Sequence, residues 1–100
     1  MIVTVFRSRL NPDAAARAAY EALAPRIAKL ARAMPGYVSH KSYVADDGER
    51  VTIVEFESMQ AQQAWSRQAE HVEAKRQGRA SFYEAFRIQV CEQLRESRFP

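Results

Sequence analysis

Cysteine, glycine and long apolar runs are scarce in this sequence of 100 residues, and each scarcity excludes something. The single cysteine, Cys91, excludes an internal disulfide and fits a reducing compartment, so we expect a cytoplasmic protein with Cys91 buried and inert. Three glycines are too few for a glycine-rich phosphate loop, which excludes a nucleotide motif of that kind. No apolar run approaches the roughly 20 residues that a membrane span needs. The N-terminus also lacks the basic segment of a signal peptide.

Metal and nucleic-acid binding are the next classes that the composition argues against. The sequence has two histidines and one cysteine, without the paired spacing that structural metal sites use. The net charge is +3, but most basic residues lie near acidic ones, as Arg17 does near Glu21. The densest basic stretch, residues 75–79, is short and contains no aromatic residue on which a base could stack. We therefore interpret it as a solvated helix end and expect neither a nucleic acid nor a membrane as partner.

Hydrophobic periodicity and turn residues divide the chain into strands and helices. Asn11-Pro12-Asp13 supplies a helix start with Asn11 as cap, Pro35-Gly36 a helix stop, and Asp46-Asp47-Gly48-Glu49 a hairpin turn. The strands are expected at Ile2–Arg9, Tyr37–Ala45, Val51–Glu57 and Phe82–Gln93. One helix is expected up to about Ala33, with a kink at Pro25, a second at Met59–Gln68 behind a Ser58 cap, and a further helical turn or two at Glu70–Gln77 ended by Gly78.

The resulting order, βαββαβ, predicts a single α+β domain over residues 1–100 with a ferredoxin-like fold. In this fold, helices cover one face of a four-stranded antiparallel sheet. Apolar residues occur on both faces, since Val5 and Ile53 cannot share a side with Phe6 and Phe56. We therefore expect a homodimer in which a second copy covers the free face. An even-length hairpin turn would place His40 opposite Glu55 and Tyr43 opposite Thr52, and strict alternation would place Tyr83, Arg87 and Cys91 on one face of the last strand.

Four segments in this order resemble the antibiotic biosynthesis monooxygenase family, whose members are dimeric α/β-barrel proteins. The segments are IVTVFRSRL, MPGYVSHKSY, VTIVEFES leading into a helix with Trp65, and EHVEAKRQGRASFYEAFRIQV. The family includes cofactor-independent oxygenases that convert phenolic polycyclic compounds into quinones, haem-degrading enzymes, and proteins without an established substrate. The resemblance implies a monooxygenase that acts on an aromatic, phenolic or polyketide-like molecule.

The resemblance also implies site residues. In the quinone-forming members a helix tryptophan follows an asparagine by one turn, an aromatic or ionisable residue comes several positions later, and an arginine on the last strand points into the cavity. Trp65 matches the tryptophan, His71 the later residue and Arg87 the arginine, whereas Ala61 stands at the asparagine position. The haem-degrading members use a histidine of this region as axial ligand, for which His71 is the candidate. They tend to carry an asparagine on the first strand, where this chain has Phe6 and Arg7.

The expected chemistry needs no metal, flavin or other cofactor, with haem as the alternative. His71 would be the general base because an unperturbed histidine has a pKa of about 6.5. Arg87 would stabilise the phenolate, Trp65 would stack on the substrate ring, and Tyr83 and Tyr20 would line the rim.

Simpler interpretations stand beside these roles. Trp65 can be a plain core residue, His71 can be exposed in a loop, and His40 can be a structural cross-strand partner of Glu55. The whole chain can likewise be a non-catalytic dimeric module that binds a small aromatic molecule.

Overall fold

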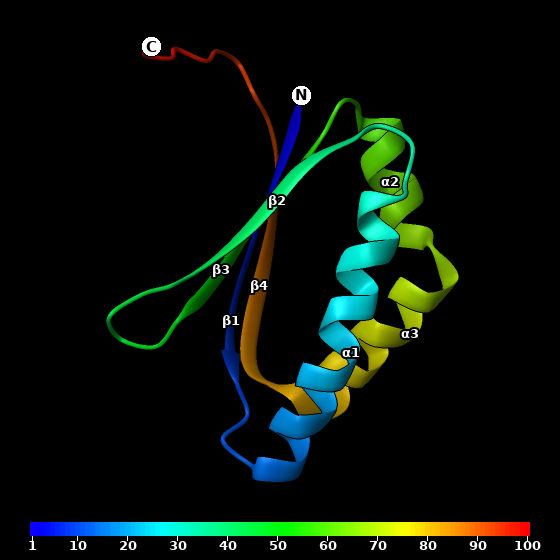
Figure 1. Cartoon of the computed structure of the whole chain (residues 1–100), viewed down its shortest axis with the longest axis vertical. Helices are drawn as coiled ribbons and strands as arrows, with labels where there is room; N and C mark the ends of the chain where they lie inside the picture. Colours follow the sequence, from blue (N-terminus) through cyan, green and yellow to red (C-terminus); the bar gives the residue numbers. More distant parts are fainter.

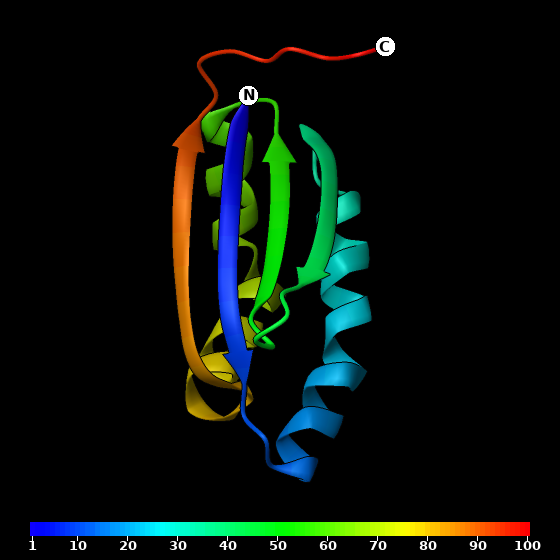
Figure 2. The same cartoon turned by 90° about the vertical axis from the view of Figure 1, so that its left-hand side faces the viewer.

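A computed structural model describes all 100 residues, and its centre is one antiparallel sheet with the strand order β2-β3-β1-β4. The three α-helices lie on one side of this sheet and leave the other side open (Figures 1 and 2). In chain order the elements are β1 (Ile2–Leu10), α1 (Ala14–Arg32), β2 (Tyr37–Val44), β3 (Arg50–Phe56), α2 (Met59–Arg67), α3 (Ala69–Gln77), the π-helical turn η1 (Gly78–Phe82) and β4 (Tyr83–Glu92). The ferredoxin-like α+β fold predicted from the sequence is confirmed. None of the helices combines the length and apolarity needed to cross a bilayer.

The strand register assigns each residue of the sheet to one of its two faces. Ile2 pairs with Phe56 and Thr4 with Val54, and these residues point toward the helices, because Phe56 packs in the core with Trp65 of α2. The alternating residues point the other way, so Val5 and its partner Ile53 lie on the uncovered face.

Helix α1 begins two residues later than the predicted cap at Asn11 implies. Asp13, rather than Asn11, is the cap, and its carboxylate accepts a hydrogen bond from the amide of Ala16. Asn11 instead accepts from the amide of Asp13, which fixes the turn before the helix. Pro25 lies within α1, which continues to Arg32. Helix α1 packs Ile27 and Leu30 against the core.

The core is small and sits at one end of the molecule, where α1 and α2 meet the sheet. Ala31, Phe56 and Trp65 are its buried members, and Phe56 is fully inaccessible to solvent. Gly36, just before β2, lets the chain pass close to α2, since a Cβ at this position would lie 2.6 Å from the Cβ of Ala61. Its φ of +80° also favours glycine.

The hairpin between β2 and β3 differs from the predicted register by one residue. His40 pairs with Val54 rather than Glu55, and Tyr43 pairs with Val51 rather than Thr52. The loop spans residues 45–49, an odd number, and Gly48 adopts a φ of +89° within it. Because one residue of register exchanges the two faces of a strand, His40 points toward the helices.

Strand β4 departs from strict alternation near its start. Gly78 does not end the helical segment, which continues through η1 to Phe82. Leu10 then pairs with Tyr83 and Arg9 with Ala85, so Glu84 is an extra residue on β4. This bulge puts Tyr83 on the helix-facing side and Arg87 on the uncovered side, whereas the sequence pattern had placed them together. The prediction that Cys91 is buried is also wrong: it is exposed, because β4 is an edge strand and its outer face is not covered.

Candidate active site beside helix α3

The central feature of the site is a contact between His71 and Trp65. Gln68 separates α2 from α3 and caps α3 by accepting a hydrogen bond from the amide of His71, at 2.7 Å. The tight link folds the His71 ring back onto the indole of Trp65, with ring centroids 4.0 Å apart and an interplanar angle of 12°. His71 Nδ1 lies 2.9 Å from the carbonyl oxygen of Trp65. Since a carbonyl only accepts, Nδ1 carries the proton and the neutral ring keeps a basic lone pair on Nε2.

The surroundings of His71 keep its ring neutral. Burial lowers the pKa of His71, and the nearby positive charge of Lys75 lowers it further, while the hydrogen bond to the Trp65 carbonyl opposes both. The net pKa is below the ordinary value of 6.5. At neutral pH the side chain is therefore in the form that can accept a proton.

Trp65 is mainly a core residue in this chain. It is 8% exposed, belongs to the core cluster with Ala31 and Phe56, and has one ring face covered by His71. A ligand that enters beside α3 would thus meet His71, with the indole behind it. The loop interpretation of His71 does not apply, because the residue lies within α3 and is half-buried.

Tyr20 and Tyr83 come together at the opposite end of the helix layer. Their ring centroids are 6.0 Å apart, and Tyr83 also contacts the ring of Phe6 at 5.4 Å. Tyr20 precedes Ile27, which packs against the core, by seven residues, or roughly 10 Å along the helix axis. Burial, together with the neighbouring Tyr20, raises the pKa of Tyr83 well above its usual range, so its hydroxyl stays protonated.

Arg87 is not part of the same site as His71. It lies on the uncovered face of the sheet, where it stands directly opposite Arg7 of β1. Both residues border a shallow hollow of about 170 Å³, together with Arg9, Glu49 and Ala85. The expectation that His71 and Arg87 share a cavity is therefore wrong within one chain, because the β4 bulge changes which residues face the helices.

A second hollow lies along α3 itself, in the stretch interpreted from the sequence as a solvated helix end. It has a volume of about 350 Å³ and is lined by Val72, Lys75, Arg76 and Arg79. Lys75 reaches back to α2 and donates to the carbonyl and hydroxyl oxygens of Ser66, at 2.6 and 3.1 Å. The spacing of 3, 4 and 7 residues that puts these four side chains on one helix flank is visible in the sequence.

The edge strand β4 presents apolar side chains to solvent on its helix-facing side. Phe86, Ile88 and Val90 pair with Ser8, Phe6 and Thr4, and they are 39%, 48% and 45% exposed. The hydroxyl of Thr4 lies on the same side, buried and without a hydrogen-bond partner. These apolar groups and this hydroxyl are the site features that the sequence reasoning missed.

His40 has a structural environment, though not the predicted one. Its Nδ1 lies 2.7 Å from the hydroxyl of Tyr37, while Glu55 accepts a hydrogen bond from Ser39 instead. Burial, and to a lesser degree Arg32, lowers the pKa of His40. No three His, Cys, Asp or Glu side chains come together in an arrangement suited to a metal ion.

The fold and the sequence together identify the family. The family model of antibiotic biosynthesis monooxygenases matches residues 1–77, and the chain belongs to this family. The uncharacterized protein YqjZ of Bacillus subtilis is 32% identical over 80 residues, which is 80% of this chain and 70% of that protein.

Solved structures show the same fold at low sequence identity. Rv0793 from Mycobacterium tuberculosis superposes with a TM-score of 0.82 at 22% identity, covering 97% of this chain and 98% of that one. SnoaB from Streptomyces nogalater, described as a cofactor-independent oxygenase, superposes with a TM-score of 0.76 at 18% identity, over 95% of this chain and 94% of SnoaB.

Proposed function

We propose that this protein is a monooxygenase that oxidises a phenolic aromatic molecule without a metal or flavin. The observation that carries the proposal is the state of His71: a neutral, half-buried imidazole whose Nδ1 is fixed by the Trp65 carbonyl and whose Nε2 is basic. Membership of the monooxygenase family supports it, as does the likeness of the fold to SnoaB.

In the proposed reaction His71 Nε2 removes a proton from a phenolic substrate with an activated ring CH₂ group. The electron-rich anion gives one electron to dioxygen, and the two radicals combine at the ring carbon to form a peroxide. Loss of water then leaves a carbonyl in place of the CH₂ group. One oxygen atom enters the product and the other leaves as water, and all four electrons come from the substrate and its C–H bonds.

Side chains on the helix-facing side of the sheet suit the binding side of this reaction. The exposed apolar strip of Phe86, Ile88 and Val90 offers a surface for a flat ring system. Trp65 would support the base and hold its orientation. Tyr20 and Tyr83 would border the substrate at the other end of the helix layer. Arg87 has no role in this proposal, because it lies on the other face of the sheet.

Haem fits these residues less well than a small aromatic molecule. The haem-degrading members tend to carry an asparagine on the first strand, where this chain has Phe6 and Arg7. The neighbouring hollow of about 350 Å³ is at the small end of ligand pockets, which run from roughly 300 to 1,000 Å³. The other alternative is a binding module without catalysis. It would bind the same kind of ligand, but His71 Nε2 would not act as a base.

We also infer that the protein is a homodimer, formed through the uncovered face of the sheet. Val3, Val5, Val51 and Ile53 form an apolar patch there, and the Nε of Arg7 beside them is buried without a hydrogen-bond partner. A second copy of the chain would cover the patch and could supply an acceptor for Arg7.

The direct test is oxygen consumption with 1,8-dihydroxyanthrone in metal-free buffer with excess chelator. We expect turnover, with label from ¹⁸O₂ in the product carbonyl. His71→Ala should lower the rate about a hundredfold or more, the usual contribution of a positioned general base. His40→Ala is the matched control, because it removes the other histidine, and it should keep the parent rate. Equal rates for His71→Ala and the parent would remove the base from the mechanism, and binding without turnover would favour the non-catalytic module.

A further inference from the structure

We infer that the hollow lined by Val72, Lys75, Arg76 and Arg79, here called the α3 cleft, binds an aromatic carboxylate whose anionic group is held by Arg79 and Lys75. The inference rests on the proposed function for the position of the aromatic ring, and it adds the class of substrate. Its starting point is the lining of the hollow on α3, which consists of three cationic side chains and Val72, with no acidic residue among them.

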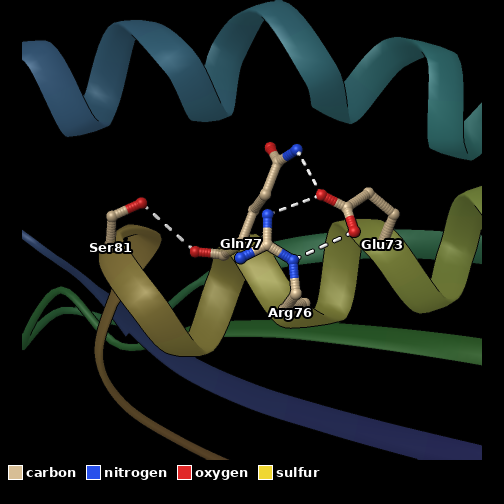
Figure 3. Close-up of polar contacts among 4 residues, drawn as sticks. All are labelled: Glu73, Arg76, Gln77 and Ser81. Atoms are coloured by element: carbon tan, nitrogen blue, oxygen red, sulfur yellow. Dashed lines mark hydrogen bonds and ion pairs between the residues drawn. The ribbon is translucent and has the colours of Figure 1, made fainter.

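Of the three cations, Arg76 is already neutralised. Its guanidinium donates twice to the carboxylate of Glu73, at 3.0 and 2.6 Å (Figure 3). This contact lowers the pKa of Glu73 to about 2, so the carboxylate stays ionised and the ion pair stays formed at neutral pH. Gln77 adds a third hydrogen bond to Glu73, as Figure 3 also shows. Arg76 is therefore paired with a residue of its own helix and is not available to a ligand.

Arg79 and Lys75 have no such acidic partner. The ion pairs of the protein join Arg9 to Asp47, Arg26 to Glu70, Arg76 to Glu73 and Arg98 to Glu96. Lys75 lies on α3, and Arg79, four residues later, lies in the π-helical turn η1 that continues it, so the two positive charges repel each other. Burial of Lys75 and repulsion from Arg79 both lower the pKa of Lys75. An anion between them would relieve this repulsion and accept hydrogen bonds from the Arg79 guanidinium and from the one Lys75 N–H that does not bind Ser66.

The position of Arg79 connects the cationic flank to the apolar strip. Its Cζ lies 5.9 Å from the centre of the Phe86 ring, so the guanidinium projects from the helix layer over β4. Ile88 and Val90 continue the strip along the same side of the strand. A ligand with its carboxylate at Arg79 would therefore lay its ring on Phe86 and the strip beyond it. Under the proposed function its phenol would reach His71, which precedes Lys75 by one turn of α3.

The cationic and apolar groups together point to a phenolic aromatic carboxylate as the ligand class, and a hydroxynaphthoate, which lacks the reactive CH₂ group, serves as its non-reacting probe. The test compares 6-hydroxy-2-naphthoate with 2-naphthol by isothermal titration calorimetry on the full-length protein. The two probes share the naphthalene ring and the phenol and differ in the carboxylate. We expect the acid to bind at least about tenfold more tightly, which corresponds to about 1.4 kcal/mol, within the usual range for hydrogen bonds to charged groups.

Two variants of Arg79 test whether this residue causes the preference for the acid over 2-naphthol. Arg79→Gln should weaken binding of the acid about tenfold and change that of 2-naphthol less than about twofold, while Arg79→Lys should retain much of the preference. Arg17→Gln, an exposed arginine of α1 outside the cleft, is the matched control and should change neither affinity. Equal binding of the two probes, or an acid preference that survives Arg79→Gln, would overturn this inference and leave the proposed oxygenase intact. Failure of the acid to bind would likewise overturn this inference, while oxygen consumption with 1,8-dihydroxyanthrone tests the proposed function independently.

Discussion

At the scale of single residues, the chemistry of the site follows from one backbone carbonyl. The carbonyl oxygen of Trp65, in the last turn of α2, lies within hydrogen-bond distance of His71 Nδ1, so the tautomer of the imidazole is set by the main chain. The stacked indole then fixes the plane of the ring. A side chain held at both a nitrogen atom and a face loses little further freedom when a substrate binds, which is what a positioned base requires.

The first residue-scale prediction concerns the pH dependence of the reaction. The pKa of His71 is lowered in the folded protein, so its basic form is complete at neutral pH and is lost as the pH falls through that lowered value. The rate kcat/KM should therefore rise with pH, with an inflection below 6.5, and be level by pH 7. Titration of the His71 ring by NMR should give the same midpoint. An inflection above 6.5 in both experiments would contradict the buried, neutral imidazole.

The positions of these side chains could be predicted from the sequence only where the backbone around them is regular. Trp65 and His71 were correctly expected near one another, because both belong to one short helical region. Arg87 was misplaced because Glu84 enters β4 as an extra residue, and a bulge leaves no clear mark in an alternating pattern. The flank of Lys75 and Arg79 was readable from its spacing, but its role depends on Phe86, which comes from another element.

At the scale of elements, the fold was predictable and the register was not. Periodicity and the positions of Pro12, Pro35 and Gly36 indicated nearly every strand and helix to within a few residues. The hairpin was harder, since Asp47-Gly48 marks a turn without stating whether its loop is odd or even. The odd loop moved His40 from Glu55 to Val54, and so from one face of the sheet to the other.

The element-scale prediction compares the two glycines that flank β2. Gly36→Ala should cost about 1–3 kcal/mol for its positive φ and about 1–3 kcal/mol more for overpacking against Ala61. Gly48→Ala has a similar φ, +89°, but nothing within 4 Å of the added methyl group, so it should show the backbone cost alone. Urea denaturation of both variants measures the difference. Equal losses of stability would mean that the contact between Gly36 and α2 is not tight.

At the scale of the whole molecule, the two faces of the sheet differ in the side chains that they carry. The helix-facing side carries the core at one end and the apolar strip beside the α3 cleft along its edge. The uncovered side has no catalytic group of the proposed mechanism, yet it carries Val and Ile side chains and the opposed pair Arg7 and Arg87. Two arginines directly opposite each other repel, which disfavours an isolated sheet and favours a partner surface with acceptors.

The last prediction tests that surface directly. Ile53 points away from the helices, opposite Val5, so a charge at this position should leave the core intact and disrupt the interface. Burying an isoleucine contributes roughly 1.5–3 kcal/mol, and an unpaired aspartate would add a desolvation cost, so Ile53→Asp should weaken association at least about tenfold. Ala22→Asp, on an exposed position of α1, is the control and should leave the assembly unchanged. Sedimentation velocity at micromolar concentration should give a dimer for the parent and the control and a monomer for Ile53→Asp. A parent protein that sediments as one chain, or an Ile53→Asp variant that remains dimeric, would show that the second copy does not bind on this face.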